Sequence, residues 1–210
     1  MNTSNKPRNP KPFPWLLVAI GLLVLGAVAA VGWNWYQKRY PSWYEEVRLS
    51  DGRVITIHQK REYYENYGTA QSWVTIDLPE LGGKQVWHSY LMPQRVDVVD
   101  GKVYVFGIPR GDVQYSYYSD PKNYIVAFSW EGVGFGRIPF ASVPESIRQE
   151  ENVYRCLPMR GGLVDIKWKD SNWCEPIGDK GQFTKMINLP EYQQASARFA
   201  RRGGRIPSSD

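Results

Sequence analysis

The sequence predicts a mainly β protein that carries one transmembrane helix near its N-terminal end. An uncharged apolar run extends from Pro12 to Gln37, and short runs rich in Val, Tyr and Trp follow it, separated by Gly and Pro. Aromatic residues make up 14% of the chain, which favours strands because aromatic and β-branched side chains suit a pleated surface. Roughly 170 residues remain beyond the apolar run, enough for one domain with a core.

The apolar run has the length and the ends of a membrane-spanning helix. Residues 15–36 would form an α-helix about 33 Å long, which matches a hydrocarbon core of about 30 Å. Trp15 lies at one end, and Trp33, Trp35 and Tyr36 lie at the other, where aromatic rings favour the membrane interface. We therefore expect a single span over residues 14–36, with these four residues at the interfaces of the lipid bilayer.

A cleaved signal peptide is the alternative for the same segment. A basic start, the apolar stretch 16–25 and the small-residue sequence Ala27-Val28-Ala29 fit that pattern. The uncharged run continues past this site to Tyr36, which favours an uncleaved signal-anchor. The numbers of Lys and Arg on the two sides of the segment are balanced, so they do not decide its orientation. Both a signal peptide and a signal-anchor with a short basic N-terminal tail send the C-terminal part across the membrane.

These considerations predict an inner-membrane, single-pass protein with an extracytoplasmic, periplasmic domain. Its expected parts are a short cytoplasmic tail at 1–13, the helix at 14–36, a stalk at 37–45, a β-rich domain at 46–190, and a short helix with a basic, partly disordered tail at 191–210. The stalk is expected because Pro41 stops the helix.

Three strand–turn–strand units are expected in the domain. Asp51-Gly52 and Asp100-Gly101 each lie between β-branched runs and indicate two-residue hairpin turns. A third turn is expected at Glu131-Gly132, and the alternation in residues 163–169 predicts a half-buried strand. Because the turns are 49 and then 31 residues apart, an antiparallel sandwich or twisted sheet is favoured over a small propeller-like domain.

The sequence gives little support for catalysis, a cofactor or a metal. His58 and His88 are isolated from each other and from the two cysteines, whereas structural zinc ligands usually come in close pairs. No Gly-x-Ser-x-Gly motif is present. The adjacent carboxylates at 45–46 and 150–151 point in different directions on a strand or helix, so we interpret them as solvated surface. An enzyme is therefore not favoured.

The cysteines and the charge distribution add two further expectations. Cys156 and Cys174 are 18 residues apart and form a possible disulfide in an oxidising compartment; two buried free thiols are the alternative. The net charge of +5 gathers at the chain ends, which does not indicate nucleic-acid binding. Four arginines in the tail would attract anionic headgroups or an acidic partner, unless they only aid solubility: Arg198, Arg201, Arg202 and Arg205.

Two tyrosine clusters in polar, loop-like contexts are the candidate binding residues. Tyrosine combines a large apolar area with a polar tip, a composition typical of recognition surfaces. The clusters predict an interaction module that binds another envelope protein. A glycan ligand or glycan processing is the alternative, and tyrosines that only cover sheet edges are a third interpretation. The candidates are Tyr63, Tyr64 and Tyr67 in the first cluster, and Tyr115, Tyr117 and Tyr118 in the second.

Overall fold

The computed structural model describes residues 14–64, 68–119, 124–158 and 162–173, together with 187, 190, 193, 194 and 197. The chain divides into two units, one ending at Lys38 and one beginning at Arg39, and each is described by itself.

The first unit contains the helix α1 (Pro14–Arg39), which the sequence predicts. It is the one helix among the described residues that is long and apolar enough to cross a membrane. Trp15, Trp33, Trp35 and Tyr36 are all exposed, and the rings of Trp33 and Tyr36 stack with centroids 6.1 Å apart. The helix continues three residues beyond the predicted end at 36.

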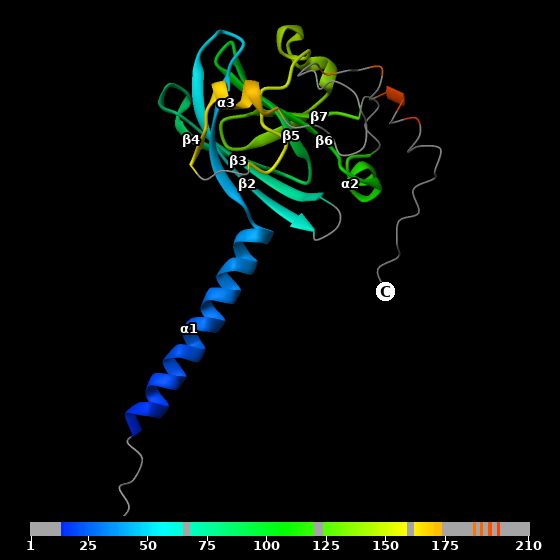
Figure 1. The fold of residues 1–210 in the computed structure, drawn as a ribbon. Coiled ribbons are helices and arrows are strands. Elements are labelled where there is room, and N and C mark those ends of the chain that lie inside the picture. The colour runs from blue at the N-terminus through cyan, green and yellow to red at the C-terminus, as the bar shows by residue number, and fades with distance from the viewer. Residues whose placement is uncertain are drawn as a thin grey trace, which may run out of the picture. The chain divides into compact units, whose positions relative to one another are not determined.

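Within the described residues, the second unit consists of nine strands in two sheets with short helical turns (Figure 1). The first sheet has the order β4-β3-β2-β1-β9 and the second has the order β5-β6-β7-β8. All pairs are antiparallel except β1 with β9. The strands are β1 (Ser42–Arg48), β2 (Val54–Tyr64), β3 (Gly68–Leu78), β4 (Gly83–Ser89), β5 (Met92–Val99), β6 (Lys102–Ile108), β7 (Val126–Trp130), β8 (Phe135–Ile138) and β9 (Leu163–Val164). The helices are η1 (Pro79–Leu81), α2 (Asp112–Tyr117), η2 (Phe140–Ser142), η3 (Glu145–Ile147) and α3 (Ile166–Ser171).

All three predicted hairpins form, and the predicted two-residue turn is confirmed at Asp100-Gly101 but wrong at Asp51-Gly52. Val99 pairs with Lys102, so Asp100 and Gly101 form a two-residue turn, and their positive φ angles of 51° and 72° are those of a type I′ turn. The Asp51-Gly52 turn joins β1 to β2 through a longer loop, since the strands separate after Arg48 and Val54. The Glu131-Gly132 turn joins β7 to β8.

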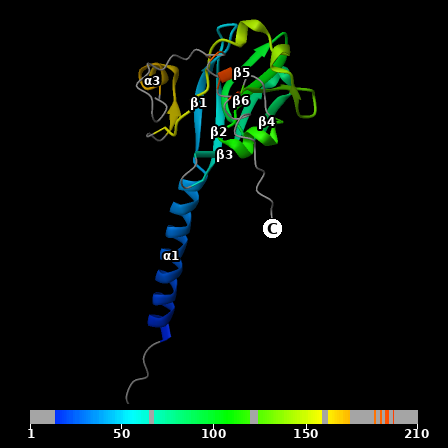
Figure 2. The ribbon, with the colours of Figure 1, turned by 90° about the vertical axis from the view of Figure 1, so that its right-hand side faces the viewer.

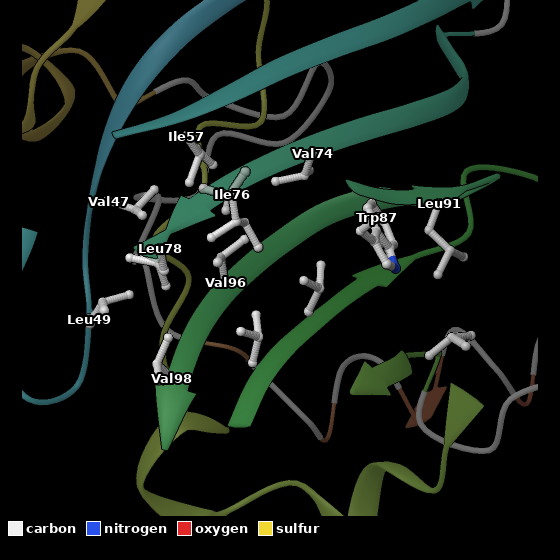
Figure 3. Packing of buried hydrophobic residues seen from close by; sticks show 14 of the residues in the cluster. Val47, Leu49, Ile57, Val74, Ile76, Leu78, Trp87, Leu91, Val96 and Val98 are labelled. Atoms are coloured by element: carbon white, nitrogen blue, oxygen red, sulfur yellow. The ribbon is translucent and has the colours of Figure 1, made fainter. Parts of the chain in front are cut away.

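The two sheets share one apolar core, so the domain has the stacked arrangement favoured over a propeller. Figure 3 shows Val96 and Val98 of β5 beside Ile76 and Leu78 of β3, and all four side chains belong to one buried cluster. A second cluster on the other side of β6 and β7 includes Phe106 and Phe140. Buried residues alternate with less buried ones along most of β2, β3 and β4, so the remaining side chains of these three strands face outward.

Two local expectations differ from the structure. Residues 163–169 were expected as one strand, but β9 has only two residues and is followed by α3. The helix begins because the Asp165 carboxylate accepts a hydrogen bond from the backbone N–H of Trp168 at 2.8 Å, which is an N-cap. The strand β1 begins at Ser42, inside the range 37–45 suggested as a stalk.

Candidate functional site

A continuous row of aromatic and basic side chains crosses the outer face of the first sheet. Lys60 of β2 pairs in register with Trp73 of β3, and Trp73 pairs with His88 of β4. The Trp73 and His88 rings are parallel within 8°, with centroids 4.8 Å apart. The Lys60 ammonium lies 5.3 Å from the Trp73 ring centroid, within the range of a cation–π contact. The Trp73 ring therefore has a neighbour on each of its two flanking strands.

The row continues beyond β4 onto the helix α2. Tyr90 follows β4, and its ring centroid is 6.1 Å from that of His88. Tyr117, on α2, meets Tyr90 edge-on at 5.0 Å and has 64% of its surface exposed. We call Lys60, Trp73, His88, Tyr90 and Tyr117 the aromatic strip.

Hydrogen bonds hold one flank of the strip. The His88 Nε2 lies 2.7 Å from Gln71 Oε1, and the Gln71 amide donates to the Glu62 carboxylate. Arg39 and Tyr40 also donate to Glu62, at 2.7 and 3.1 Å. These bonds lower the pKa of Glu62 from its usual value, with the Gln71 amide making the largest contribution, so Glu62 is a carboxylate at neutral pH. Partial burial lowers the pKa of His88, which favours its neutral form.

Buried tyrosines in and next to α2 hold this helix against the rest of the domain. The Tyr118 hydroxyl lies within hydrogen-bond distance of Ser89 Oγ and accepts from the backbone N–H of Tyr90 at 3.1 Å. Tyr115 stacks on Tyr124 at 5.5 Å, and burial raises the pKa of Tyr124 to about 12. The exposed Tyr117 therefore projects from a helix that is held by contacts with β4 and with the second cluster of buried apolar residues.

The predicted tyrosine clusters are only partly surface groups. Tyr115 and Tyr118 are 3% and 6% exposed, so the interpretation of a polar loop there was incorrect for these two residues. The physical reason is helical spacing, since residues three apart on α2 share the face turned to the core. Tyr117 is exposed and Tyr63 is half-buried. The Tyr64 side chain and Tyr67 lie outside the described residues.

A second polar assembly lies inside the domain, between β1 and α3. The Glu45 carboxylate accepts from Lys169 Nζ at 3.2 Å, from Gln59 Nε2 at 2.8 Å and from the backbone N–H of Tyr154 at 3.0 Å. Arg61 donates to the carbonyl of Tyr154 at 2.6 Å. Figure 2 shows α3 on the β1 side of the domain, away from β5 and β6. We call Glu45, Gln59, Arg61, Tyr154 and Lys169 the buried polar network.

The interpretation of the adjacent carboxylates as solvated surface is wrong for Glu45 and Glu151, whereas Glu150 is exposed as expected and Glu46 is half-buried. Glu45 is completely buried, and Glu151 is 2% exposed and pairs with Arg155 at 2.6 Å. Each of these carboxylates is occupied by protein donors, which is the usual condition for a buried charge. The arrangement therefore stabilises the fold and leaves no carboxylate of the pair directed at a ligand.

Within the described part of the chain, no group of three or more His, Cys, Asp and Glu side chains is placed to hold a metal ion. His58 and His88 lie in separate ring pairs, with Tyr44 and with Trp73. Cys156 is half-buried, and Cys174 lies outside the described residues, so the disulfide between them stays a prediction. The tail arginines at 198, 201, 202 and 205 also lie outside them.

Comparison of the chain with protein-family models, curated proteins and solved structures gives no match. The function must therefore be argued from the geometry of the site.

Four members of the aromatic strip were missed by the analysis of the sequence. Lys60, Trp73, His88 and Tyr90 come from three different segments, and only the strand register brings them together. The alternation of Val86, His88 and Tyr90 with buried residues is a signal that could have placed them on one outer face.

Proposed function

We propose that this chain is a single-pass inner-membrane protein whose β-rich domain is extracytoplasmic and binds another protein of the cell envelope through the aromatic strip. The observation that carries the proposal is the unbroken series of ring contacts from Trp73 to Tyr117 on an outward face. Large aromatic rings held in place by neighbours provide contact area at low entropic cost, which is the composition of interface hot spots.

The geometry of Trp73 favours a protein partner over a glycan. Sugar rings stack on an open aromatic face, but Trp73 is flanked by His88 on β4 and by Lys60 on β2. What the strip offers a ligand is ring edges, the exposed Tyr117 and the Lys60 ammonium. Such a surface suits a partner that supplies both apolar side chains and hydrogen-bond acceptors.

The anchor is supported by α1, whose length and composition suit one crossing of a membrane. Mass spectrometry of the purified protein should recover peptides from residues 15–36, and a mature N-terminus at Ala30 would contradict the anchor. A reporter enzyme that is active only outside the cytoplasm, fused after residue 210, should be active. An inactive reporter would place the domain on the cytoplasmic side.

The binding proposal is tested by affinity capture from detergent-solubilised membranes. Tyr117→Ala should reduce recovery of the partner, because removing an interface tyrosine can cost about 2 kcal/mol of binding. Val133→Ala, at a fully exposed position in the β7–β8 turn, is the matched control and should capture normally. Equal capture by the wild type and Tyr117→Ala would remove the strip from the interface.

A further inference from the structure

A pocket of about 830 Å³ opens where the aromatic strip meets α2. Its lining includes Ala70 of β3, Tyr90, and the α2 region from Arg110 to Tyr117. This volume is within the range of about 300–1,000 Å³ that is usual for ligand pockets. Val113 and Tyr90 in this lining are 71% and 40% exposed, so the pocket offers apolar surface to a ligand.

The pocket is preformed, and the side chain of Gln114 holds its walls together. Its amide nitrogen donates to the carbonyls of Thr69 and Ala70 at 3.0 and 2.8 Å, and its amide oxygen accepts from the backbone N–H of Arg110 at 2.5 Å. The two bonds to the carbonyls tie α2 to β3, and the third fixes the residue Arg110 against the first turn of α2. Since Tyr118 ties the other end to Tyr90, the two walls of the pocket hold a fixed separation.

A single guanidinium gives the pocket its polar specificity. Arg110 is exposed, and among the described residues its side chain makes no hydrogen bond or ion pair. It lies over Gly68, with Nη2 3.6 Å from the position that a Cβ there would take. The planar fork of an arginine matches a carboxylate with two parallel hydrogen bonds. Asp112 also lines the pocket, so a ligand carboxylate must approach from the Arg110 side.

We propose that this pocket binds a peptide segment of the partner that carries a bulky apolar residue next to an acidic residue. The apolar side chain lies against Tyr90, Val113 and Tyr117, and the carboxylate pairs with Arg110. The inference rests on the proposed function, because it names the part of the partner that the strip binds. Continuity favours a peptide over a free small molecule, since Tyr90 and Tyr117 belong to both the pocket and the aromatic strip.

The test uses the full chain in lipid nanodiscs and an array of immobilised peptides Ac-Gly-Ser-Φ-Glu-Ser-Gly-NH2, with Leu, Ile, Phe or Trp at Φ. Companion peptides replace Glu with Gln or Lys, or replace Φ with Ser. The proposal expects binding only where both Φ and Glu are present. Arg110→Gln should weaken that binding about tenfold, and Val113→Ser should also weaken it. Lys102→Gln, at the exposed first residue of β6, is the matched control.

The outcomes separate this inference from the proposed function. Equal binding of the Glu and Gln peptides, no change in Arg110→Gln, or no peptide binding at all would overturn the pocket proposal. If Arg110→Gln and Val113→Ser capture the partner normally from solubilised membranes while Tyr117→Ala does not, the strip binds a partner without this pocket. If none of the three affects capture, the proposed function itself fails.

Discussion

The buried polar network and the aromatic strip share the strand β2, whose residues Gln59 and Arg61 face the interior while Lys60 between them faces outward. Each region contains the residues usually expected in the other place. The network holds Glu45, Arg61 and Lys169 inside the domain, whereas the strip holds Trp73 and Tyr117 on its outer face. Burying charge costs free energy unless each charge is paired and hydrogen-bonded. Exposing rings forgoes the free energy that their burial would have gained.

The buried polar network is structural, whereas the aromatic strip is available for binding. In the network every charged group is saturated by partners from distant segments, so its removal should disturb folding. In the strip the rings contact mainly one another, so their removal should disturb binding.

The largest effect is expected from Lys169→Met, which removes the cation from the network. Glu45 would remain buried without its ion-pair partner, and breaking a buried pair costs about 3–5 kcal/mol of the free energy of unfolding. Denaturant titration of the full chain in detergent measures this loss. Lys167→Met, on the same helix but exposed, should change stability by less than about 0.5 kcal/mol. A stable Lys169→Met variant would show that the pair does not hold α3 to β1.

The second effect concerns the segment that supplies Tyr154 to the buried polar network. If Cys156 and Cys174 are bonded, closing a loop of about 18 residues stabilises the fold by about 3 kcal/mol in the entropic model. Cys174→Ser should lower the melting temperature, and adding a reductant to the wild type should lower it equally. Alkylation of both thiols in the unreduced, denatured protein would show that no bond exists.

In the strip, Trp73→Ala should separate binding from stability. The loss of a cross-strand ring pair costs less than about 1 kcal/mol of the free energy of unfolding, whereas the loss of an interface tryptophan costs about 2 kcal/mol of binding. Denaturation and partner capture are measured on the same preparation, with Thr75→Ala on the same strand and face as the control. If Trp73→Ala lost stability as Lys169→Met does, the contrast between the two regions would be broken.

The smallest effect is a pH dependence carried by the outward face. Burial lowers the pKa of His58, with Lys84 and Lys60 adding repulsion, and burial alone lowers the pKa of His88. The unfolded chain therefore binds more protons than the folded chain just below pH 6.5, so stability rises with pH there. The melting temperature should be slightly lower at pH 5.5 than at pH 7.5, and His58→Gln with His88→Gln should flatten this dependence. An unchanged slope in that double variant would assign it to other groups.

Local signals were enough to predict the helix and the hairpins. The apolar run predicts α1, and Asp100-Gly101 suits a turn in which both residues have positive φ angles. Short segments are harder to interpret, because six or seven residues can fit both the helical period of 3.6 residues and the strand period of two. In residues 163–169 the alternation was real, but the Asp165 cap produced a helix after two strand residues.

The candidate site was less predictable because long-range contacts create it. Nothing near Lys169 in the sequence indicates burial, since its carboxylate partner Glu45 is 124 residues away. Tyr115, Tyr117 and Tyr118 lie in the same short polar stretch of the sequence. Only their positions on the helical turn determine which of them are buried and which is exposed. The strip depends on the register of three strands, which local patterns do not specify.

Site-specific photo-crosslinking in intact cells tests whether the aromatic strip is the binding surface. The photoreactive residue p-benzoyl-phenylalanine is placed at position 117 in the strip, and at position 133 in the β7–β8 turn as the exposed control. The account predicts a discrete adduct with one envelope protein at position 117 and none at position 133. An adduct with the same protein at position 133 alone, or at neither position, would contradict it.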